Sequence, residues 1–254
     1  ESEKTPDGKF KLAQLVRANR ELERICRAYR LPCVSGKDSM KNDYGVWPNK
    51  ISIPPTMLFS LFGNHVDVRN TATSNFKKHG QRIYLVGNSK NELGASEVAY
   101  HLNEKNLVEG IGGNVPRLPE PERQLDIYRR LSKTIQNGLI RTAHDCSEGG
   151  LAVAVAEMCI GGRLGAIIDI DGIGEGDSFS RLWSESLGRI VVAVDAEHEI
   201  QFIESMSDAD IHLIGMVTDT QILIIEDGYD ELIQANVSDL TKSWKEALDM
   251  TGGV

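Results

Sequence analysis

The stretch Thr142-Ala-His-Asp-Cys-Ser-Glu-Gly-Gly-Leu-Ala-Val-Ala-Val-Ala-Glu-Met-Cys-Ile-Gly-Gly162 joins a polar turn to an apolar helix, and the rest of the chain is arranged around it. Apolar side chains recur in it at intervals of three and four residues, which predicts one buried helical stripe. The stripe consists of Leu151, Ala154, Val155, Met158 and Cys159. The pair Gly161-Gly162 is expected to end the helix.

The polar turn before this helix permits two interpretations. Gly149 and Gly150 allow the backbone to come close to a bound group, and the N–H groups at a helix start favour an anion. The functional interpretation is a helix N-terminus that faces a phosphate-bearing ligand. The structural interpretation is a helix whose first amides are capped by Asp145 or Ser147.

Strand and helix patterns alternate on both sides of this stretch, which predicts an α/β or α+β fold. Strands are expected at 82–87, 139–143, 166–170 and 190–194, with 211–217 and 221–226 forming a hairpin. Helices are expected at 95–105, from Pro121 to Gly138, at 196–206 with Ile200, Ile203 and Met206 inward, and from a cap at Ser238.

The N-terminal part has its own pattern, with a helix over 11–30 that Pro32 ends and a short strand at 31–34. The polar string Ser35-Gly-Lys-Asp-Ser39 then offers hydroxyls, an ammonium and a carboxylate. It could contact phosphate or metal, or form a solvated turn. Residues 56–63 alternate apolar side chains as a strand buried largely on both faces does.

A polar stretch after Val68 divides the chain into a domain at 1–72, a linker at 73–79 and a second domain at 80–254. The opening residues, which begin at Glu1 without a methionine, have the composition of the middle of a longer protein, so a fragment is expected.

Composition narrows the class of protein. Hydrophobic residues make up 41% and charged residues 26% of 254 residues, which is ordinary for a soluble globular protein. The net charge of −9 and the pI near 5.2 argue against nucleic-acid or membrane partners. The four cysteines form no Cys-x-x-Cys pair and no apolar run is long enough for a membrane span, so a reduced, cytoplasmic chain is expected.

Several motifs together resemble one family. They are Leu31-Pro-Cys-Val-Ser-Gly-Lys-Asp-Ser39, Pro54-Pro-Thr56, Tyr84-Leu-Val-Gly87 ahead of Leu93-Gly-Ala-Ser-Glu97, His144-Asp-Cys-Ser-Glu-Gly-Gly-Leu151, and Ser184-Glu-Ser-Leu-Gly-Arg189. In this order they resemble the second synthetase repeat of phosphoribosylformylglycinamidine synthase. The resemblance implies the back half of a synthetase-like N-terminal α/β domain, followed by a complete C-terminal domain like that of aminoimidazole ribonucleotide synthetase.

The resemblance also implies a reaction. In it, ATP activates the formamide oxygen of formylglycinamide ribonucleotide, and glutamine-derived ammonia displaces that oxygen to give the amidine. ATP and Mg²⁺ would act in the complete enzyme, with a first synthetase repeat and a glutaminase domain or subunit as partners. Because the catalytic His and the glutaminase belong to those other parts, the resemblance implies no catalytic residue in this chain, and the isolated fragment is expected to be inactive and able to self-associate.

Site residues are carried over by motif. Gly36 matches a backbone contact to ATP, and Lys37 stands where shorter family members have a magnesium-binding Asn. An ammonium cannot bind Mg²⁺, so Lys37 is a candidate for contacting nucleotide phosphate and the metal ligands stay unassigned. Substrate contacts are implied for five residues: Ser39, Asp145, Ser184, Glu185 and Ser186.

Two alternatives stay open. This repeat could be a non-catalytic scaffold that holds a structural nucleotide. The chain could also belong to a related synthetase, one that makes aminoimidazole ribonucleotide or selenophosphate, although the Ser35–Ser39 string fits those enzymes poorly.

Overall fold

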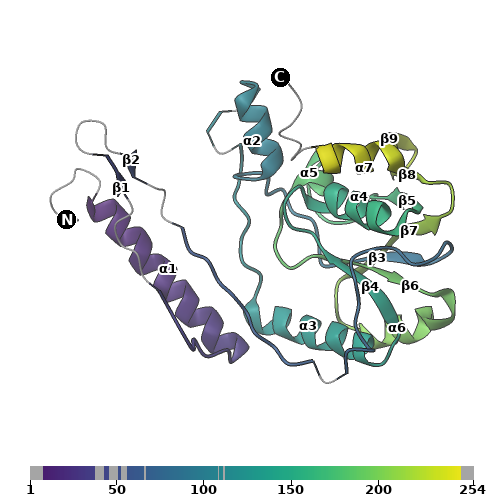
Figure 1. Cartoon of the computed structure of the whole chain (residues 1–254), viewed down its shortest axis with the longest axis horizontal. Helices are drawn as coiled ribbons and strands as arrows, with labels where there is room; N and C mark the ends of the chain where they lie inside the picture. Colours follow the sequence, from purple (N-terminus) through teal and green to yellow (C-terminus); the bar gives the residue numbers. More distant parts are fainter. Residues whose placement is uncertain are drawn as a thin grey trace. The chain divides into compact units, whose positions relative to one another are not determined.

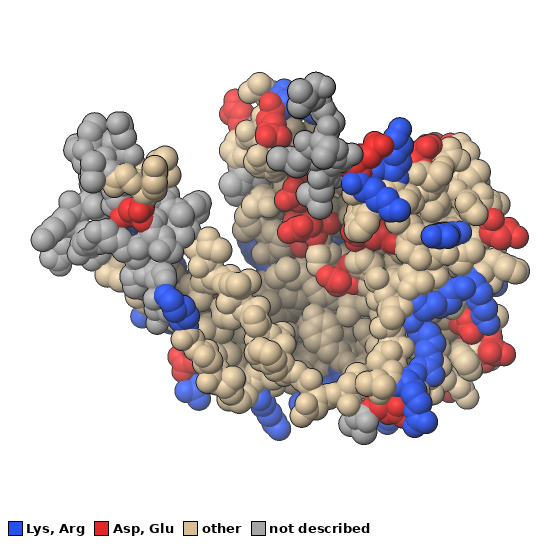
Figure 2. Space-filling model, viewed as in Figure 1, with Lys and Arg blue, Asp and Glu red and all other residues tan. Residues whose placement is uncertain are grey.

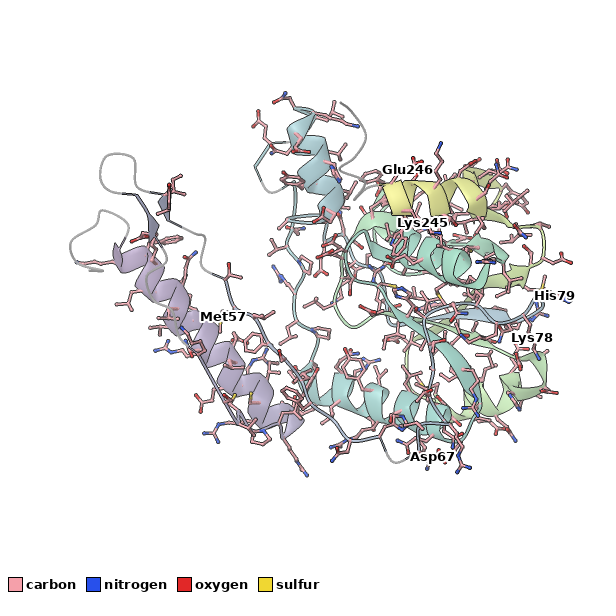
Figure 3. All side chains as sticks on the ribbon, viewed as in Figure 1. Met57, Asp67, Lys78, His79, Lys245 and Glu246 are labelled. Atoms are coloured by element: carbon pink, nitrogen blue, oxygen red, sulfur yellow. The ribbon has the colours of Figure 1, made fainter. Side chains whose placement is uncertain are left out.

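The computed structural model describes residues 8–37, 43–45, 51–52, 56–65, 67–107, 109–110 and 112–246 (Figure 1). The chain divides into two compact units, Glu1–Val66 and Asp67–Val254. Figure 3 labels Met57 in the first unit and Asp67 at the start of the second. No helix in the described part of the chain is both long and apolar enough to cross a membrane.

The first unit contains the predicted helix, α1 (Gly8–Tyr29), and one antiparallel pair, β1 (Asp43–Tyr44) and β2 (Ile51–Ser52). A turn closes the C-terminus of α1. In it Arg30 adopts φ +56°, its N–H bonds the carbonyl of Arg27 at 3.3 Å, and the N–H of Leu31 bonds the carbonyl of Cys26 at 2.9 Å. This pair of bonds is a Schellman motif, which turns the chain back over the helix end. The strand predicted at 31–34 is therefore absent, and 31–37 has no regular structure.

The strand predicted at 56–63 is also absent. These residues form no strand, and the side chains of Leu58 and Phe62 are 90% and 91% exposed. Apolar alternation predicts a strand only where a neighbour supplies ladder hydrogen bonds and a surface to bury it. No strand within the described residues pairs with this segment.

The second unit is a seven-stranded mixed sheet with helices on both faces. Its spatial order is β4-β6-β3-β7-β5-β8-β9, with every neighbouring pair antiparallel except β5 and β8. The strands are β3 (Arg82–Val86), β4 (Ile140–Asp145), β5 (Gly165–Asp169), β6 (Ile190–Val194), β7 (Ile211–Thr218), β8 (Ile222–Asp227) and β9 (Asp230–Asn236).

The helices of this unit include every one that the sequence predicted. They are α2 (Glu97–Glu104), α3 (Pro121–Gln136), α4 (Gly150–Gly162), α5 (Ser178–Trp183), α6 (Glu199–Ser205) and α7 (Val237–Glu246), with a 3-10 turn η1 (Ala196–His198). This α/β architecture confirms the predicted fold class.

The hairpin predicted between 211–217 and 221–226 is wrong. Both strands form, as β7 and β8, but β5 lies between them and pairs with both. The hairpin of this region is instead β8 with β9, a strand that the sequence did not predict. The two strands were predicted to pair because they are close in sequence. The insertion of β5 between them depends on tertiary packing, which the local pattern does not reveal.

Alternate residues of the central strands enter two separate cores, as the two-residue period of a strand requires. Ile83 and Leu85 of β3 belong to the core that contains α4. Tyr84 and Val86 belong to the other, which includes residues of α3 and α6. Figure 1 shows the layers, with α4 and α7 on one side of the sheet and α3 and α6 on the other.

The helix expected at 196–206 is present in two pieces, η1 and α6, but its inner face differs. Met206 is fully buried as predicted, and Phe202 is buried beside it. Ile200 and Ile203, which were also predicted to face inward, are 73% and 44% exposed. The phenyl ring of Phe202 lies 5.1 Å from the ring of Tyr84. The change from a 3-10 turn to an α-helix alters the angular spacing of the side chains, which a simple helical wheel did not anticipate.

The stripe predicted for α4 is confirmed, since all five of its residues are buried. Gly161 and Gly162 lie inside the last turn, and the left-handed residue that closes the helix is Arg163, at φ +54°. The glycines serve close packing instead. A Cβ on Gly162 would stand 2.6 Å from the carbonyl oxygen of Phe76.

The segment expected to be a linker, 73–79, packs into the second unit. Phe76 is 1% exposed and its N–H bonds the carbonyl of Met158 at 3.2 Å. Thr73 forms a bridge with Thr142 beside β4. The polar composition that suggested a linker reflects side chains at the surface of a segment whose backbone is held by α4 and β4.

We expect Gly162→Ala to lower the free energy of unfolding by about 1–3 kcal/mol, because the added methyl group overlaps the backbone of Phe76. Urea denaturation measures this loss. Arg163→Gly is the matched control, and it should stabilise the protein slightly because glycine adopts φ +54° without strain. A neutral Gly162→Ala would show that this close approach is absent in solution.

Candidate functional site

A pocket of about 280 Å³ lies where β4 ends and α4 begins. It is lined by His144, Asp145, Ser147, Glu148, Ala154 and Glu157. Asp145 is the last residue of β4, and Ala154 and Glu157 lie on the adjoining part of α4. The predicted substrate residue Asp145 is thus placed at a real concavity.

Hydrogen bonds fix the imidazole and the carboxylate in this pocket. His144 Nε2 lies 3.1 Å from Glu157 Oε2, and His144 Nδ1 lies 2.8 Å from the carbonyl oxygen of Asp145. The hydroxyl of Ser147 donates to Asp145 Oδ2, and this bond holds the pKa of the Asp145 carboxyl below its usual range. Asp145 is therefore an ionised acceptor at neutral pH, and its side chain is 71% exposed.

The charge of the pocket limits what it binds. Three carboxylates line it, from Asp145, Glu148 and Glu157, and the described residues of its lining include no Lys or Arg. Such a surface attracts cations and accepts hydrogen bonds from hydroxyl or amine groups, and it repels a bare phosphate. The pocket therefore suits the hydroxyl-bearing or amine part of a small ligand.

The Gly149-Gly150 pair accommodates protein rather than a ligand. Both residues adopt positive φ, +77° and +65°. A Cβ on Gly150 would stand 2.5 Å from the carbonyl oxygen of Ser184. Only glycine therefore leaves room for the backbone that packs here. The predicted close approach is real, but the group that approaches is residues 182–184 of the same chain.

The carboxylate of Glu185 occupies the position that the sequence assigned to an anion. Glu185 Oε1 accepts the N–H of Gly149, the N-cap of α4, at 2.9 Å. The same oxygen accepts the N–H of Glu97, the first residue of α2, also at 2.9 Å. A negative charge at two helix starts satisfies amides that lack partners within their helices. The hydroxyl of Ser147 bonds the carboxylate of Asp145 instead, and the carbonyl of Ser147 accepts the N–H of Gly150, the first residue of α4, at 3.0 Å.

The side chains of Ser184 and Ser186 are buried. The two residues are 0% and 1% exposed. The Ser186 hydroxyl accepts the N–H of Lys90 at 3.1 Å and lies 3.4 Å from the Ser184 hydroxyl. The predicted triplet Ser184, Glu185 and Ser186 is therefore brought together, but its polar atoms are engaged within the chain.

A buried guanidinium organises this network. The sequence placed Arg189 in the motif at 184–189, but its burial was not predicted. Arg189 is 2% exposed and donates to the Ser89 hydroxyl at 2.7 Å, to the carbonyl of Ser186 at 3.2 Å and to the carbonyl of Ser184. Burial lowers the pKa of Arg189. The available signal was its place directly before the apolar strand β6, where an arginine without polar partners would be costly.

The remaining predicted residues lie in the first unit. Gly36 and Lys37 are exposed in the segment that follows α1. Ser39 lies outside the described residues.

The cluster of possible metal ligands that the described residues contain does not suit Mg²⁺. The one cluster of three His, Cys, Asp or Glu ligand atoms found in this part of the chain is Asp195, Glu197 and His198. It follows β6, whereas Asp145 pairs with Ile190 at the other end of that strand. Lys78 Nζ already pairs with Asp195 Oδ2 at 2.9 Å. An ammonium beside the carboxylate opposes a cation, so this cluster does not fit magnesium.

Residues 78–228, more than half of the chain, match the family described as "AIR synthase related protein, C-terminal domain". The chain belongs to this family. The matched region runs from just before β3 through β8, so it includes the pocket and the Glu185–Arg189 network.

Solved structures of a Thermotoga maritima protein share the fold. Its complex titled "T. maritima PurL complexed with FGAR" has a TM-score of 0.59 at 18% identity, covering 68% of this chain and 30% of that one. The complex with ATP has a TM-score of 0.55, also at 18% identity, covering 68% and 28%. "Structure of PurLQS from Thermotoga maritima" has 0.55 at 19% identity, covering 69% and 28%. This chain therefore spans less than a third of the length of those it resembles.

We expect Glu185→Ala to lower the free energy of unfolding by about 1–3 kcal/mol, because two helix-terminal amides lose a charged acceptor. Glu185→Gln keeps an acceptor oxygen without the charge, so its loss should be smaller. Urea denaturation compares both variants with Glu148→Gln, which removes a charge at an exposed position in the loop that precedes α4. If Glu185→Ala were no more destabilising than Glu148→Gln, Glu185 would not hold the two helices.

We expect Ser147→Ala to raise the pKa of Asp145 toward its ordinary value, because the hydroxyl that stabilises the ionised form is removed. The carboxyl pKa of Asp145 is depressed in the folded protein, so its contribution to stability is present above the unfolded pKa near 3.9 and is lost as pH falls through the lower folded pKa. Carbon-detected NMR titration of the carboxyl groups measures the shift. An unchanged pKa in Ser147→Ala would contradict this assignment.

Proposed function

We propose that this chain is part of an ATP-dependent carbon–nitrogen ligase of the phosphoribosylformylglycinamidine synthase type. Such an enzyme converts formylglycinamide ribonucleotide and glutamine-derived ammonia to formylglycinamidine ribonucleotide in purine biosynthesis. The observation that carries the proposal is the coincidence of the family fold over 78–228 with the ordered motifs at 31–39, 144–151 and 184–189. The fold match to T. maritima PurL, with titles naming FGAR and ATP, supports it.

Within this proposal the chain's residues have distinct roles. Gly36 and Lys37 contact the nucleotide, Lys37 as a point charge on phosphate, and Ser39 contacts the ribonucleotide substrate. Asp145, an exposed acceptor at the pocket, takes a hydrogen bond from a hydroxyl or amine group of the substrate. Ser184, Glu185 and Ser186 support the site from within, because their polar atoms are already engaged.

The rest of the enzyme supplies what this chain does not. A first synthetase repeat and a glutaminase would provide the reacting groups and the ammonia. Mg²⁺ would be held there too, since the cluster at Asp195 does not fit it. No residue of this chain is assigned a catalytic role, and the isolated chain is expected to form no product. The cytoplasmic location proposed for it is that of a reduced biosynthetic enzyme.

The second candidate function is a non-catalytic scaffold that braces its partner repeat and holds a structural nucleotide. One observation favours it: the Ser184–Ser186 triplet, matched by motif to a substrate-contacting segment, is tied into the Arg189 network. A related synthetase that makes aminoimidazole ribonucleotide or selenophosphate is the third candidate, because it would share the family domain.

To test these functions, the chain is combined with a first synthetase repeat and a glutaminase, and formation of formylglycinamidine ribonucleotide is followed. We expect Asp145→Asn to lower kcat/KM about tenfold or more, which corresponds to about 1.4 kcal/mol of lost transition-state binding. Glu148→Gln is the matched control in the same pocket, and it should have the smaller effect.

The outcomes separate the candidates. Product formation with a selective loss in Asp145→Asn supports a ligand-contacting pocket. Full turnover in Asp145→Asn with altered stability only supports the scaffold. Failure to form product, with ATP consumed on a different ribonucleotide or on selenide, would identify a related synthetase.

A further inference from the structure

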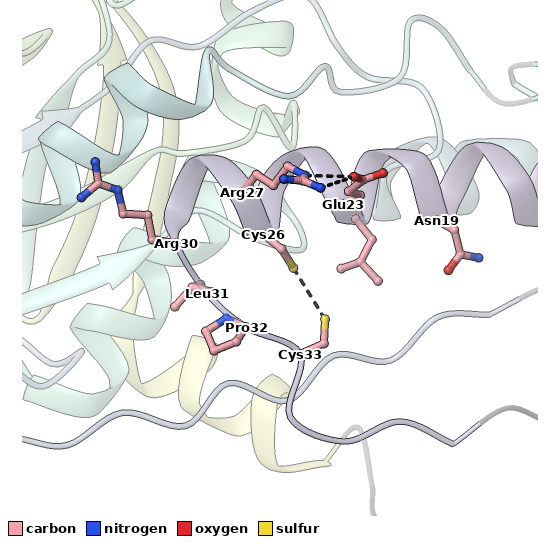
Figure 4. A pocket seen from close by; sticks show the side chains of 9 residues that line it. Asn19, Glu23, Cys26, Arg27, Arg30, Leu31, Pro32 and Cys33 are labelled. Atoms are coloured by element: carbon pink, nitrogen blue, oxygen red, sulfur yellow. Dashed lines mark hydrogen bonds and ion pairs between the residues drawn. The ribbon is translucent and has the colours of Figure 1, made fainter.

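Two cysteines of the first unit face each other at the end of α1. Cys26 Sγ and Cys33 Sγ lie 3.7 Å apart (Figure 4). Both line an open pocket of about 550 Å³ that runs along α1 and the segment after it. Cys33 is exposed and Cys26 is partly exposed, so reagents reach the pair.

The turn after α1 creates this pair. The bond from the Leu31 N–H to the Cys26 carbonyl places residue 31 directly over residue 26, and Pro32 carries the chain back along the helix. Cys33 then lies beside Cys26, although six residues separate them. Because 31–37 has no regular structure, Cys33 can move without breaking a helix or a sheet ladder.

We propose that Cys26 and Cys33 form a reversible redox pair that closes to an intramolecular disulfide with low-molecular-weight disulfides such as oxidised glutathione. The sulfurs need only approach from 3.7 Å to the bonded distance of about 2.0 Å. The inference concerns the first unit and goes beyond the ligase function of the whole.

The chemistry is thiol–disulfide exchange in two steps. The thiolate of Cys33, the more exposed residue, attacks one sulfur of the reagent, forms a mixed disulfide and releases one glutathione thiolate. The Cys26 thiolate then attacks the Cys33 sulfur, breaks the mixed disulfide and releases the second glutathione. The protein loses two electrons and two protons, and the reagent gains both.

The order of these steps follows from the exposure of the sulfurs. Cys33 is exposed and Cys26 only partly so, which favours the first attack by Cys33. The hydrogen bond between the two sulfurs, in which either can donate, raises the pKa of Cys26. A metal ion bound by the two thiols fits this pair less well than a disulfide, because closed sites for soft metals use three or four protein ligands. No third His, Cys, Asp or Glu ligand atom groups with these thiols in the described part of the chain.

The other two cysteines are internal controls. Cys146 and Cys159 are buried in the second unit, and burial raises their pKa values to about 11 and about 12. Both are therefore inert thiols at neutral pH. Selective reaction at Cys26 and Cys33 in the folded chain follows from this contrast.

The test is oxidation of the reduced full chain in glutathione buffers of graded redox ratio, then alkylation, tryptic digestion and mass spectrometry. Trypsin cuts after Arg24, Arg27, Arg30 and Lys37, so a disulfide joins the peptides 25–27 and 31–37, and reduction separates them. We expect this linked pair in the folded chain at a proportion of oxidised glutathione about tenfold lower than in the urea-unfolded chain.

Single variants distinguish the pair from ordinary surface thiols. In Cys26→Ser and in Cys33→Ser, oxidation should end at a glutathione adduct on the remaining cysteine. In the parent chain the adduct should react further and give the linked peptides. Glutathione adducts alone in the parent chain, disulfides between two chains, or equal linkage in the folded and unfolded chains would each overturn the proposal.

Discussion

The second unit depends on one carboxylate and the guanidinium behind it. Glu185 holds the first amides of α2 and α4 together, and Arg189 fixes the backbone that carries Glu185. Both helices therefore begin at defined positions relative to each other, although the loops that precede them come from different parts of the chain. Burying the Arg189 side chain is costly, and its bonds to Ser89, Ser184 and Ser186 offset that cost.

This arrangement decides which surface can meet a ligand. The N–H of Gly149 already donates a hydrogen bond to the carboxylate of Glu185. The backbone from Leu182 to Ser184 fills the space beside Gly150. The neighbouring pocket keeps an exposed, ionised Asp145, and no Lys or Arg stands among the described residues that line it. In Figure 2 the drawn face of the second unit carries acidic side chains close to α2, while Lys and Arg line the edge near Lys78. A ligand of this pocket would bring the hydrogen-bond donors.

The sequence predicted what depends on local pattern. The buried stripe of α4, the core strands β3 and β6 and the helix α1 were predicted from the spacing of apolar residues. This spacing is a local property that does not depend on how the elements are arranged. The insertion of β5 between β7 and β8 was not predicted, because strand order is a tertiary choice. The predicted strand at 56–63 failed for a related reason, since its pattern describes a strand whose neighbours are not in the described chain.

The sequence predicted which motifs lie near the pocket, but it did not predict what each residue does there. The motifs at 144–151 and 184–189 do meet, but sequence could not tell whether the anion at the start of α4 is a ligand or Glu185. The pairing of Cys26 with Cys33 was missed because Arg30, not glycine, occupies the left-handed position of the turn. Without that glycine, nothing marked a reversal of the chain after α1.

Amide hydrogen exchange at Gly149 and Glu97, followed by NMR without any ligand, tests the central claim most directly. If Glu185 holds these amides, both are protected in the ligand-free protein, and adding ATP or formylglycinamide ribonucleotide leaves their protection unchanged. If both exchange as fast as exposed loop amides and become protected only when a phosphorylated ligand is added, the start of α4 is a ligand site and the account of Glu185 is wrong.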